Sequence, residues 1–330
     1  MEIVYIYRSP KMGISISVDF PPIVNCVSKK YKTKSITFST GNYSVFSLMK
    51  NIYITLRYMK KHKDAVIHIT GTENYLIPFL KRYKTVVTVH DLGFYEIMKP
   101  GIKKKIKYKL FVESLKYADR VVFISQKSMQ EGKKLVAINE EKTSVIYNCV
   151  NPAYSPSCFH RFNSEKPVVL QVGTKINNKN LERTAEALKD IPCTFRIIGN
   201  LNEERKNNLK KLGIDFIQKE NLSEEEMVEE YQSCDIVVFA SLYEGFGVPI
   251  IEGQACGKPI VTSNIPPMTE VAGDSCVLVD PESVLSIRNG VIEAILNHEK
   301  YEKMSKDNVK RFSAESRAEK YISVYKSIID

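Results

Sequence analysis

The sequence predicts an α/β protein with two doubly wound parallel sheets. Its 330 residues exceed what one hydrophobic core usually serves. Short β-branched apolar segments alternate with longer amphipathic segments, a pattern typical of parallel strands joined by helical crossovers. The pattern pauses at residues 148–157, which contain two prolines among polar residues, and then restarts. We therefore expect a first domain at 1–152, a linker at 153–165 and a second domain at 166–313.

The elements of the first half follow from short apolar runs separated by polar segments. The helix at 44–62 places Phe46, Met49, Ile52, Leu56 and Met59 on one side. Strands are expected at 2–7, 35–39, 64–70, 85–90, 120–125 and 144–147, and helices at 44–62, 73–81 and 108–117, the last continuing a basic helix at 101–110.

The second half repeats the strand–helix alternation. Ser223 is a suitable N-cap for a helix with acidic residues in its first turn. Gly257 can adopt the left-handed conformation that ends the helix at 249–256. Strands are expected at 168–172, 193–198, 215–217 and 235–240, and helices at 181–188, 223–233, 249–256, 281–297 and 317–329.

Composition and charge exclude several classes of protein. The seven cysteines are scattered and contain no CxxC pair, which favours reduced thiols and a reducing compartment. The first segment lacks the long apolar core of a signal peptide, and no apolar run approaches the length of a membrane span. Residues 1–150 carry 26 Lys and Arg against 11 Asp and Glu, whereas 151–330 carry 22 against 27. Only the first half is therefore expected to meet a polyanion.

The segment 241–252, SLYEGFGVPIIE, combines a glycine turn with two carboxylates. It follows a buried strand and opens a helix, and ligands of open parallel sheets bind at the carboxyl ends of strands. The amides of Gly247 and Val248 would be free donors for an anion such as a diphosphate. The two oxygens of Glu252 could accept both hydroxyls of a ribose, with Glu244 toward a sugar. The alternative is a structural turn whose carboxylates lie near a helix dipole.

The segments EGFGVPIIEGQACGKPIVTS and NIPPMTEVAGDSCVLVDP resemble the nucleotide-binding signature of glycosyltransferase family 4. The similarity continues through 172–188 (VGTKINNKNLERTAEAL) and 86–95 (VVTVHDLGFY). Members of this family are retaining transferases of the GT-B architecture, in which two Rossmann-like domains face each other across a cleft. The resemblance implies that the last helix, at about 314–330, packs back on the first domain.

The resemblance also implies roles for individual residues. It places His90, in the HD pair after a strand, against the donor sugar, and Lys179 on the leaving diphosphate, while Glu244 orients the sugar; these three form the expected catalytic set. Many relatives carry an arginine where this chain has Thr174, and the neighbouring Lys175 could replace it. The full set of expected donor-binding residues is Gly13, Thr174, Lys175, Lys179, Gly245, Phe246, Gly247, Val248 and Glu252.

The densest basic cluster lies in GIKKKIKYKL at 101–110. As an amphipathic helix it could bury an apolar stripe and offer lysines to an acceptor or to anionic lipid. The alternative is a solvated helix packed on its own domain. No nucleic-acid recognition motif is present. The expected acceptor- or membrane-facing residues are Lys103, Lys104, Lys105, Lys107 and Lys109.

These observations predict a metal-independent hexosyltransferase. The donor would be a UDP- or GDP-sugar on the second domain, and the acceptor a glycan or lipid-linked hydroxyl on the first. No D-x-D pair is present to hold a cation, so we expect neither metal nor cofactor. The expected location is cytoplasmic, with peripheral contact at the inner membrane face left open. The alternatives are a sugar-nucleotide epimerase and a non-catalytic polyanion-binding protein; a dehydrogenase lacks support because no G-x-G-x-x-G follows the first strand.

Overall fold

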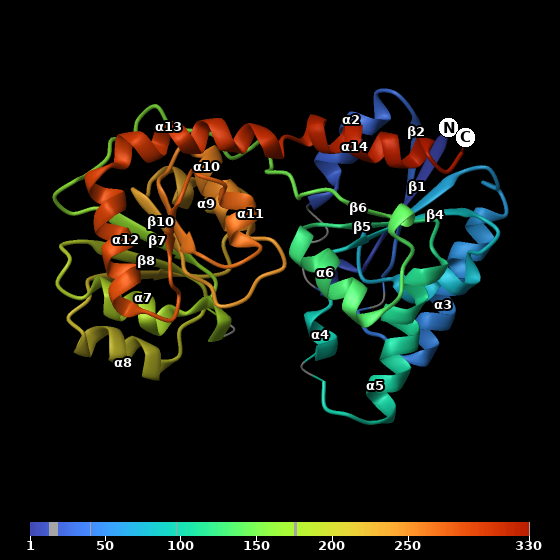
Figure 1. Cartoon of the computed structure of the whole chain (residues 1–330), viewed down its shortest axis with the longest axis horizontal. Helices are drawn as coiled ribbons and strands as arrows, with labels where there is room; N and C mark the ends of the chain where they lie inside the picture. The colour runs from blue at the N-terminus through green and yellow to red at the C-terminus, as the bar shows by residue number, and fades with distance from the viewer. Residues whose placement is uncertain (13–18, 40, 97, 175–176, 330) are drawn as a thin grey trace. The chain divides into compact units, whose positions relative to one another are not determined.

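The computed structural model describes residues 1–12, 19–39, 41–96, 98–174 and 177–329. The chain divides into two compact units: unit 1 comprises Met1–Cys149 and Ala314–Asp330, and unit 2 comprises Val150–Ser313. Each unit contains a six-stranded sheet in which all described strand pairs are parallel, with helices on both faces (Figure 1). The expected α/β class with two doubly wound sheets is therefore confirmed.

The sheet of unit 1 has the strand order β2-β1-β3-β4-β5-β6. The order reverses direction between β1 and β3, which makes their carboxyl ends a topological switch point. The strands are β1 (Glu2–Tyr7), β2 (Lys32–Thr37), β3 (Val66–Ile69), β4 (Lys84–Val89), β5 (Arg120–Phe123) and β6 (Thr143–Val145). The helices and turns are η1 (Pro10–Met12), α2 (Pro21–Ser28), α3 (Val45–Met59), η2 (Asn74–Phe79), α4 (Gly93–Glu96), α5 (Ile102–Lys107), η3 (Tyr108–Val112), η4 (Glu113–Tyr117), α6 (Gln126–Leu135), η5 (Glu140–Lys142) and α14 (Ala314–Lys326).

Both faces of this sheet are buried. Alternate residues of β1 serve opposite faces: Val4 and Ile6 join the core under α3 and η2, whereas Ile3 and Tyr5 join the core under α2 and α14. The terminal helix α14 therefore belongs to unit 1, although the whole of unit 2 separates it from the other elements of unit 1 in the sequence.

Buried polar contacts fix α14 to the sheet. The Nδ1 atom of His68 lies 2.6 Å from the Tyr325 hydroxyl, and its Nε2 lies 2.8 Å from the Thr88 hydroxyl. Burial lowers the pKa of His68, so this imidazole is neutral and bonded on both sides. Near the start of α14, Arg317 donates to Asp19 over 2.6 Å. These contacts orient a helix that hydrophobic packing alone would allow to rotate.

The predicted apolar face of α3 is confirmed for three of its five residues: Met59 lies in the core of unit 1, and Ile52 and Leu56 pack against it. Phe46 is 77% exposed and Met49 is 61% exposed. The buried line is instead polar over most of its length, and it consists of Ser47, Asn51, Thr55 and Met59. These polar side chains are bonded inside the unit; for example, Asn51 donates to the Tyr75 hydroxyl over 2.8 Å. Hydropathy alone misplaces Phe46 and Met49 because the buried positions beside them, Ser47 and Asn51, are polar and hydrogen-bonded inside the unit.

Two other segments of unit 1 differ from the expected α-helices. The segment expected as a helix at 73–81 is a 3₁₀ turn with Pro78 inside it. The basic helix ends at Lys107, continues as the π-helical turn η3 and then as the 3₁₀ turn η4. Because the helical pitch changes twice along this segment, its apolar residues do not form the single continuous stripe that regular α-helical spacing would produce.

Unit 2 has the strand order β12-β11-β10-β7-β8-β9, with its switch point between β7 and β10. The strands are β7 (Val168–Val172), β8 (Thr194–Ile198), β9 (Phe216–Lys219), β10 (Ile236–Phe239), β11 (Ile260–Ser263) and β12 (Val277–Val279). The helices and turns are η6 (Asn177–Lys179), α7 (Leu181–Leu188), α8 (Glu203–Lys211), α9 (Glu224–Gln232), α10 (Val248–Ala255), α11 (Met268–Ala272), α12 (Val284–Leu296), α13 (His298–Asn308) and η7 (Val309–Phe312).

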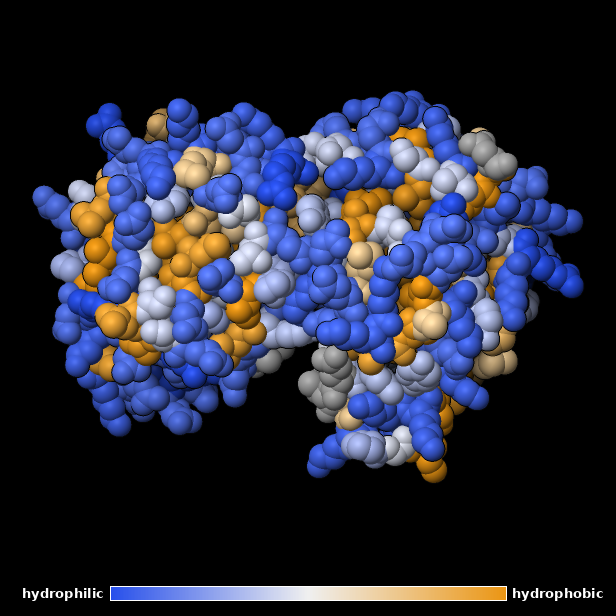
Figure 2. Space-filling view, viewed as in Figure 1, coloured by the Kyte–Doolittle hydropathy of each residue, from blue (hydrophilic) through white to orange (hydrophobic). Residues whose placement is uncertain are grey.

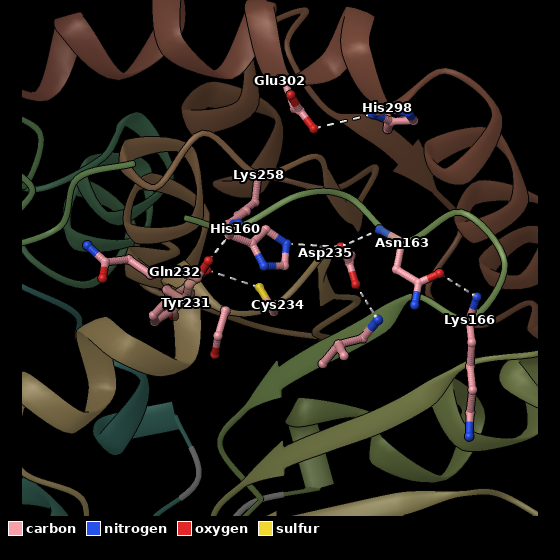
Figure 3. A network of polar contacts seen from close by, with 12 residues as sticks. His160, Asn163, Lys166, Tyr231, Gln232, Cys234, Asp235, Lys258, His298 and Glu302 are labelled. Carbon is pink, nitrogen blue, oxygen red and sulfur yellow. Dashed lines mark hydrogen bonds and ion pairs between the residues drawn. The ribbon is translucent and has the colours of Figure 1, made fainter. Parts of the chain in front are cut away.

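The expected linker at 153–165 is part of unit 2. Figure 3 shows the contact that holds its second half: the buried carboxylate of Asp235 accepts from His160 and from the Asn163 amide, each over 3.0 Å. The same carboxylate accepts from the amide of Val168 at the start of β7 over 2.7 Å. Asp235 precedes β10, so one side chain joins the linker segment to two central strands.

Candidate active site

The site in unit 2 lies at the carboxyl ends of β7 and β10, the two strands that flank its switch point. The β7 strand leads to a loop that ends in η6 and α7, and β10 leads to the glycine turn before α10. Open parallel sheets bind ligands at this position because the two loops diverge and leave backbone groups exposed between them.

Lys179 and Glu244 meet at the centre of this site. The Nζ atom of Lys179 lies 2.6 Å from Oε1 of Glu244, and their side chains are 22% and 16% exposed. The same Nζ lies 4.8 Å from the centroid of the Phe239 ring, which shields one side of the ammonium group. The sequence predicted both residues as functional but did not predict that they pair.

Backbone contacts fix the position of Lys179. Asn178 donates to the carbonyl of Tyr243 over 2.8 Å, and the Leu242 amide donates to the carbonyl of Asn178 over 2.8 Å. Gly173, with φ of +93°, passes close to Lys179: a Cβ atom at this position would lie 3.1 Å from Cε of the lysine. A side chain at residue 173 would therefore displace the ammonium group.

The amino end of α10 provides backbone donors beside this pair. Gly247 is its N-cap residue and adopts a left-handed conformation with φ of 111°, which glycine tolerates without cost. Val248 and Pro249 form the first turn, and the first amides of a helix have no acceptor within it. The positive end of the helix dipole and the ammonium group of Lys179 thus form a region suited to an anion.

Glu252 lies in the next turn of α10 and is partly exposed. The Tyr231 hydroxyl donates to its Oε2 atom over 2.7 Å. Burial raises the pKa of Glu252, while hydrogen bonds from Tyr231 and Tyr154 act in the opposite direction. Neither tyrosine was predicted, because their side chains come from α9 and the linker segment. Their rings pack edge to face with centroids 5.4 Å apart and support the carboxylate from behind.

The side chains of two predicted donor-binding residues are buried in unit 2. Thr174 is 1% exposed, and its hydroxyl donates to the carbonyl of Asn200 over 2.6 Å. Phe246 is 3% exposed and its ring packs edge to face on Phe312, so the ring is not presented to a ligand. Gly13 and Lys175 lie outside the described residues. Gly245 precedes Phe246 in the turn between the two carboxylates.

Arg205 supports the loop that contains Thr174. Arg205 of α8 donates to the carbonyl of Thr174 over 2.6 Å, to Glu182 over 2.8 Å and to the Asn177 side chain over 3.3 Å. Sequence reasoning missed Arg205 because it lies 31 residues from the loop that it holds. With its guanidinium bonded to three groups of unit 2, this arginine positions the loop that carries Lys179.

Unit 1 has its own cavity of about 330 Å³ at its switch point. Arg8 follows β1, Thr72 and Asn74 follow β3, and His90 follows β4, so three neighbouring strands direct residues into it. The lining residues are Arg8, Tyr43, Gly71, Thr72, Asn74, Val89, His90, Asp91, Leu92, Lys107 and Phe111. Of these, sequence reasoning identified only His90 and Lys107 as functional candidates.

His90 is held in one tautomer. Its Nε2 atom lies 2.9 Å from the carbonyl oxygen of Thr70, which can only accept, so Nε2 carries the proton. Burial lowers the pKa of His90, which keeps the ring neutral. Its Nδ1 atom is then an acceptor. A ligand hydroxyl that reaches Nδ1 would therefore donate to the ring.

Glu73 lies next to this cavity and is 2% exposed. Burial raises its pKa to about 7, although the positive charge of Arg8 acts in the opposite direction. Its Oε2 atom is buried and has no hydrogen-bond partner among the described residues, and the same holds for Oδ1 of Asn74 in the cavity wall. A carboxyl group and an amide oxygen are thus held near the cavity with unused hydrogen-bonding capacity.

The basic helix α5 projects from unit 1 and contains no buried residue. Ile102 is 78% exposed and Ile106 is 53% exposed, so the helix is not packed on its own domain through an apolar stripe. Lys104 differs from the other predicted lysines: it donates to the carbonyl of Met98 over 3.1 Å and lies 4.5 Å from the Tyr95 ring centroid. The exposed lysines are Lys103, Lys105, Lys107 and Lys109.

In the part of the chain that the structure describes, no three His, Cys, Asp or Glu side chains gather as a metal site would require. Across the same residues, no helix has the length and apolar character needed to cross a bilayer.

Comparisons with known proteins identify the family. Residues 159–311 match the family described as Glycosyl transferases group 1, and residues 36–154 match Glycosyltransferase Family 4. The O-antigen chain mannosyltransferase B of Escherichia coli is 25% identical, over 72% of this chain and 67% of its own. RfbU, an O-antigen chain mannosyltransferase of Salmonella typhimurium, is 25% identical over 85% of this chain and 76% of its own. An N-acetylgalactosaminyltransferase of Campylobacter jejuni, which is named for diphospho-undecaprenol, is 25% identical over 69% of this chain and 66% of its own.

Solved structures share the fold of the whole chain. Sucrose-phosphate synthase of Thermosynechococcus elongatus has a TM-score of 0.79 at 16% identity, over 99% of both chains. The Anabaena protein HepE in complex with UDP and glucose has a TM-score of 0.76 at 16% identity, over 99% of this chain and 100% of its own. The two matches to family descriptions, the curated relatives and this shared fold agree with one another. The chain belongs to the group 1/family 4 glycosyltransferases and has their GT-B fold.

Proposed function

We propose that this glycosyltransferase moves a hexose-type sugar from a UDP- or GDP-sugar to a hydroxyl of a glycan or lipid-linked acceptor, with retention of configuration. The observation that carries the proposal is the pairing of Lys179 with Glu244 beside the amino end of α10, at the switch point of unit 2. Among the fold relatives, HepE is described with UDP and glucose, which supports a nucleotide-sugar donor.

The donor diphosphate would bind to Lys179 and to the amides of Gly247 and Val248. A diphosphate carries more charge than a carboxylate, so it would compete with Glu244 for the ammonium group. Glu244 would then be free to accept hydroxyls of the donor sugar. In this scheme the ion pair keeps both side chains in place before the donor binds.

The ribose would be held by Glu252. Tyr231 uses one lone pair of Oε2, and each carboxylate oxygen can accept more than one hydrogen bond, so Glu252 retains capacity for the ribose hydroxyls. The tyrosine contact fixes the rotamer in advance, which reduces the entropy lost on binding.

The chemical step would rely on stabilising the departing diphosphate. Lys179 and the helix amides would neutralise the charge that develops on the leaving group. The phosphate oxygen would take the proton of the acceptor hydroxyl as that hydroxyl attacks from the same face. Neutral His90 would accept from a sugar hydroxyl through Nδ1 and so orient the donor, and no metal would be required.

The acceptor would bind to unit 1, in or near the cavity that contains His90. Two relatives are named as O-antigen chain mannosyltransferases and a third for diphospho-undecaprenol, which supports work on a cell-surface polysaccharide and a lipid-linked acceptor. The exposed lysines of α5 and the start of η3, namely Lys103, Lys105, Lys107 and Lys109, would contact an anionic membrane surface electrostatically. Such contact would weaken as salt is added.

The first test is thermal unfolding with UDP, GDP or NAD, each in EDTA. At a hundred times its dissociation constant a nucleotide stabilises its domain by about 2.7 kcal/mol. For a domain of this size the midpoint rises by roughly 2–4 °C for each kcal/mol. We expect a rise with UDP or GDP and none with NAD, and we expect Lys179→Ala to reduce it. Lys210→Ala, an exposed lysine on α8, is the matched control.

The outcomes separate the proposal from its alternatives. No response to either UDP or GDP would contradict a nucleotide-sugar donor, and a response to NAD alone would indicate a different enzyme. An undiminished response in Lys179→Ala would remove this lysine from the donor site. Once a donor is found, release of nucleotide only when an acceptor is present would identify transfer, whereas turnover of the donor alone would contradict it.

A further inference from the structure

The exposed side of α3 carries a contiguous apolar stripe. Val45 and Phe46 are each 77% exposed, and Met49 and Tyr53 are each 61% exposed. Residues four apart lie on one side of a helix, so Val45, Met49 and Tyr53 line up and Phe46 lies beside them. A soluble monomer gains nothing by presenting large apolar side chains to water in this way.

The charges around this stripe are of one sign. Lys50, Arg57 and Lys60 are exposed on the same helix or at its end. Residues 41–63, which span the start of the stripe, the helix and its end, contain five Lys and Arg and no Asp or Glu. An apolar stripe flanked by cations is typical of a helix that lies in the surface layer of an anionic bilayer.

The stripe lies next to the two features of unit 1 that were assigned to the acceptor. Tyr43, just before α3, packs edge to face on Phe111 with ring centroids 5.1 Å apart. Phe111 belongs to η3, which continues directly from α5, and both aromatic residues line the cavity that contains His90. At α5 itself Ile102 and Ile106 are exposed, and Figure 2 shows hydrophobic atoms near the end of this helix among hydrophilic ones.

We infer that the amino-terminal half of α3 inserts Val45, Phe46, Met49 and Tyr53 into the surface of an anionic lipid bilayer. This inference rests on the proposed lipid-linked acceptor and adds a hydrophobic contact to the electrostatic one of α5. Insertion of this stripe holds the cavity of unit 1 close to the bilayer, where the acceptor's lipid anchor resides.

The charge pattern favours lipid over other occupants. A second copy of this chain would bring the exposed Lys50, Arg57 and Lys60 against the same cations of its partner, and the like charges would repel. A nucleic acid would engage the cations, but its phosphate backbone offers no apolar partner for Val45 and Met49. A bilayer of anionic lipid satisfies both components, with headgroups for the cations and acyl chains for the stripe.

The first experiment measures partitioning into vesicles. The probes are vesicles of phosphatidylglycerol with phosphatidylethanolamine and vesicles of phosphatidylcholine, and the variant is Phe46→Ser with Met49→Ser. We expect the anionic partition coefficient of the variant to fall about tenfold, since each buried methylene contributes to binding. The matched control is Leu285→Ser with Leu296→Ser on α12 of unit 2, residues that are 65% and 74% exposed. Equal partitioning of the variant and the natural chain would overturn the inference.

The second experiment measures insertion directly. The chain contains no tryptophan, so Phe46→Trp introduces a single fluorophore into the stripe. We expect its emission to shift to shorter wavelength with anionic vesicles and to be quenched by lipids brominated on their acyl chains. Leu285→Trp should show neither effect. An unchanged Phe46→Trp emission while the protein is bound to vesicles would show that the stripe stays in water.

Two further outcomes keep this inference separable from the proposed function. A nucleotide-dependent thermal shift together with absent vesicle binding would overturn insertion and leave the donor site intact. Stripe substitutions that dissociate a dimer in sedimentation, without changing vesicle binding, would show that a second copy covers the stripe and would also overturn insertion. Vesicle binding with insertion but no nucleotide response would support the inference while contradicting the donor.

Discussion

Glu73 offers a test of how burial controls ionisation next to the cavity of unit 1. The pKa of this carboxyl is about 7 in the folded chain, against an ordinary value of 4.5. A proton held more tightly in the folded state stabilises the fold at low pH. This stability is complete below about pH 4.5, where Glu73 is protonated in both states, and is lost as pH rises toward 7.

The magnitude follows from the difference between the two pKa values. Each factor of ten in proton affinity corresponds to about 1.4 kcal/mol, so ionising Glu73 costs about 3 kcal/mol between pH 4.5 and 8. Glu73→Gln keeps the shape and cannot ionise. The substitution should therefore remove most of the pH-dependent loss of stability. The difference in unfolding free energy between Glu73→Gln and the parent should favour the variant by about 3 kcal/mol more at pH 8 than at pH 4.5.

The assay is urea unfolding at both pH values in a Tyr83→Trp background, because Tyr83 is half-buried against the core of unit 1. Because the chain has no other tryptophan, the emission reports on unit 1 alone. Glu141→Gln, an exposed glutamate in unit 1, is the control and should follow the parent at both pH values. If Glu73→Gln and the parent lose stability equally between pH 4.5 and 8, then Glu73 does not hold a proton near neutrality and the reasoning fails.

Two further predictions concern buried side chains. Tyr231→Phe removes the donor to Glu252 and should weaken nucleotide binding by about threefold to tenfold, measured by calorimetry, since a hydrogen bond contributes about 0.5–1.5 kcal/mol; unchanged affinity would show that the hydroxyl does not position Glu252. Arg317→Met leaves Asp19 buried without its cation and should cost about 3–5 kcal/mol in urea unfolding, with partial recovery on adding Asp19→Asn. Lys320→Met, exposed on the same helix, should change little, and a loss equal to that of Arg317→Met would contradict the role of the pair.

The parts of the fold that could be predicted are those determined by local pattern. The strands Glu2–Tyr7 and Val168–Val172 and the helix Leu181–Leu188 have the expected bounds, because apolar runs and glycine or asparagine breaks coincide there. Ser223 caps its helix as expected, in a reciprocal capping box with Glu226.

The parts that could not be predicted depend on side chains from distant segments. The buried line of α3 contains Asn51 and Thr55, and its stability comes from partners that periodicity does not reveal. In the site, Lys179 and Glu244 were each identifiable, but their ion pair joins loops 65 residues apart. The sequence did not reveal the role of Tyr231, because a tyrosine that donates to a buried carboxylate cannot be distinguished in a sequence from any other core aromatic.

The discontinuity of unit 1 has a consequence for synthesis on the ribosome. Its first 149 residues emerge early, yet one face of its sheet is completed only by α14, after the continuous segment of unit 2 has been made. The contact between Tyr5 and Tyr325 spans 320 positions and closes last. Unit 2 can therefore reach its native state before α14 has been made, whereas the segment 1–149 keeps an apolar sheet face open until α14 has emerged, and so depends on chaperones for longer.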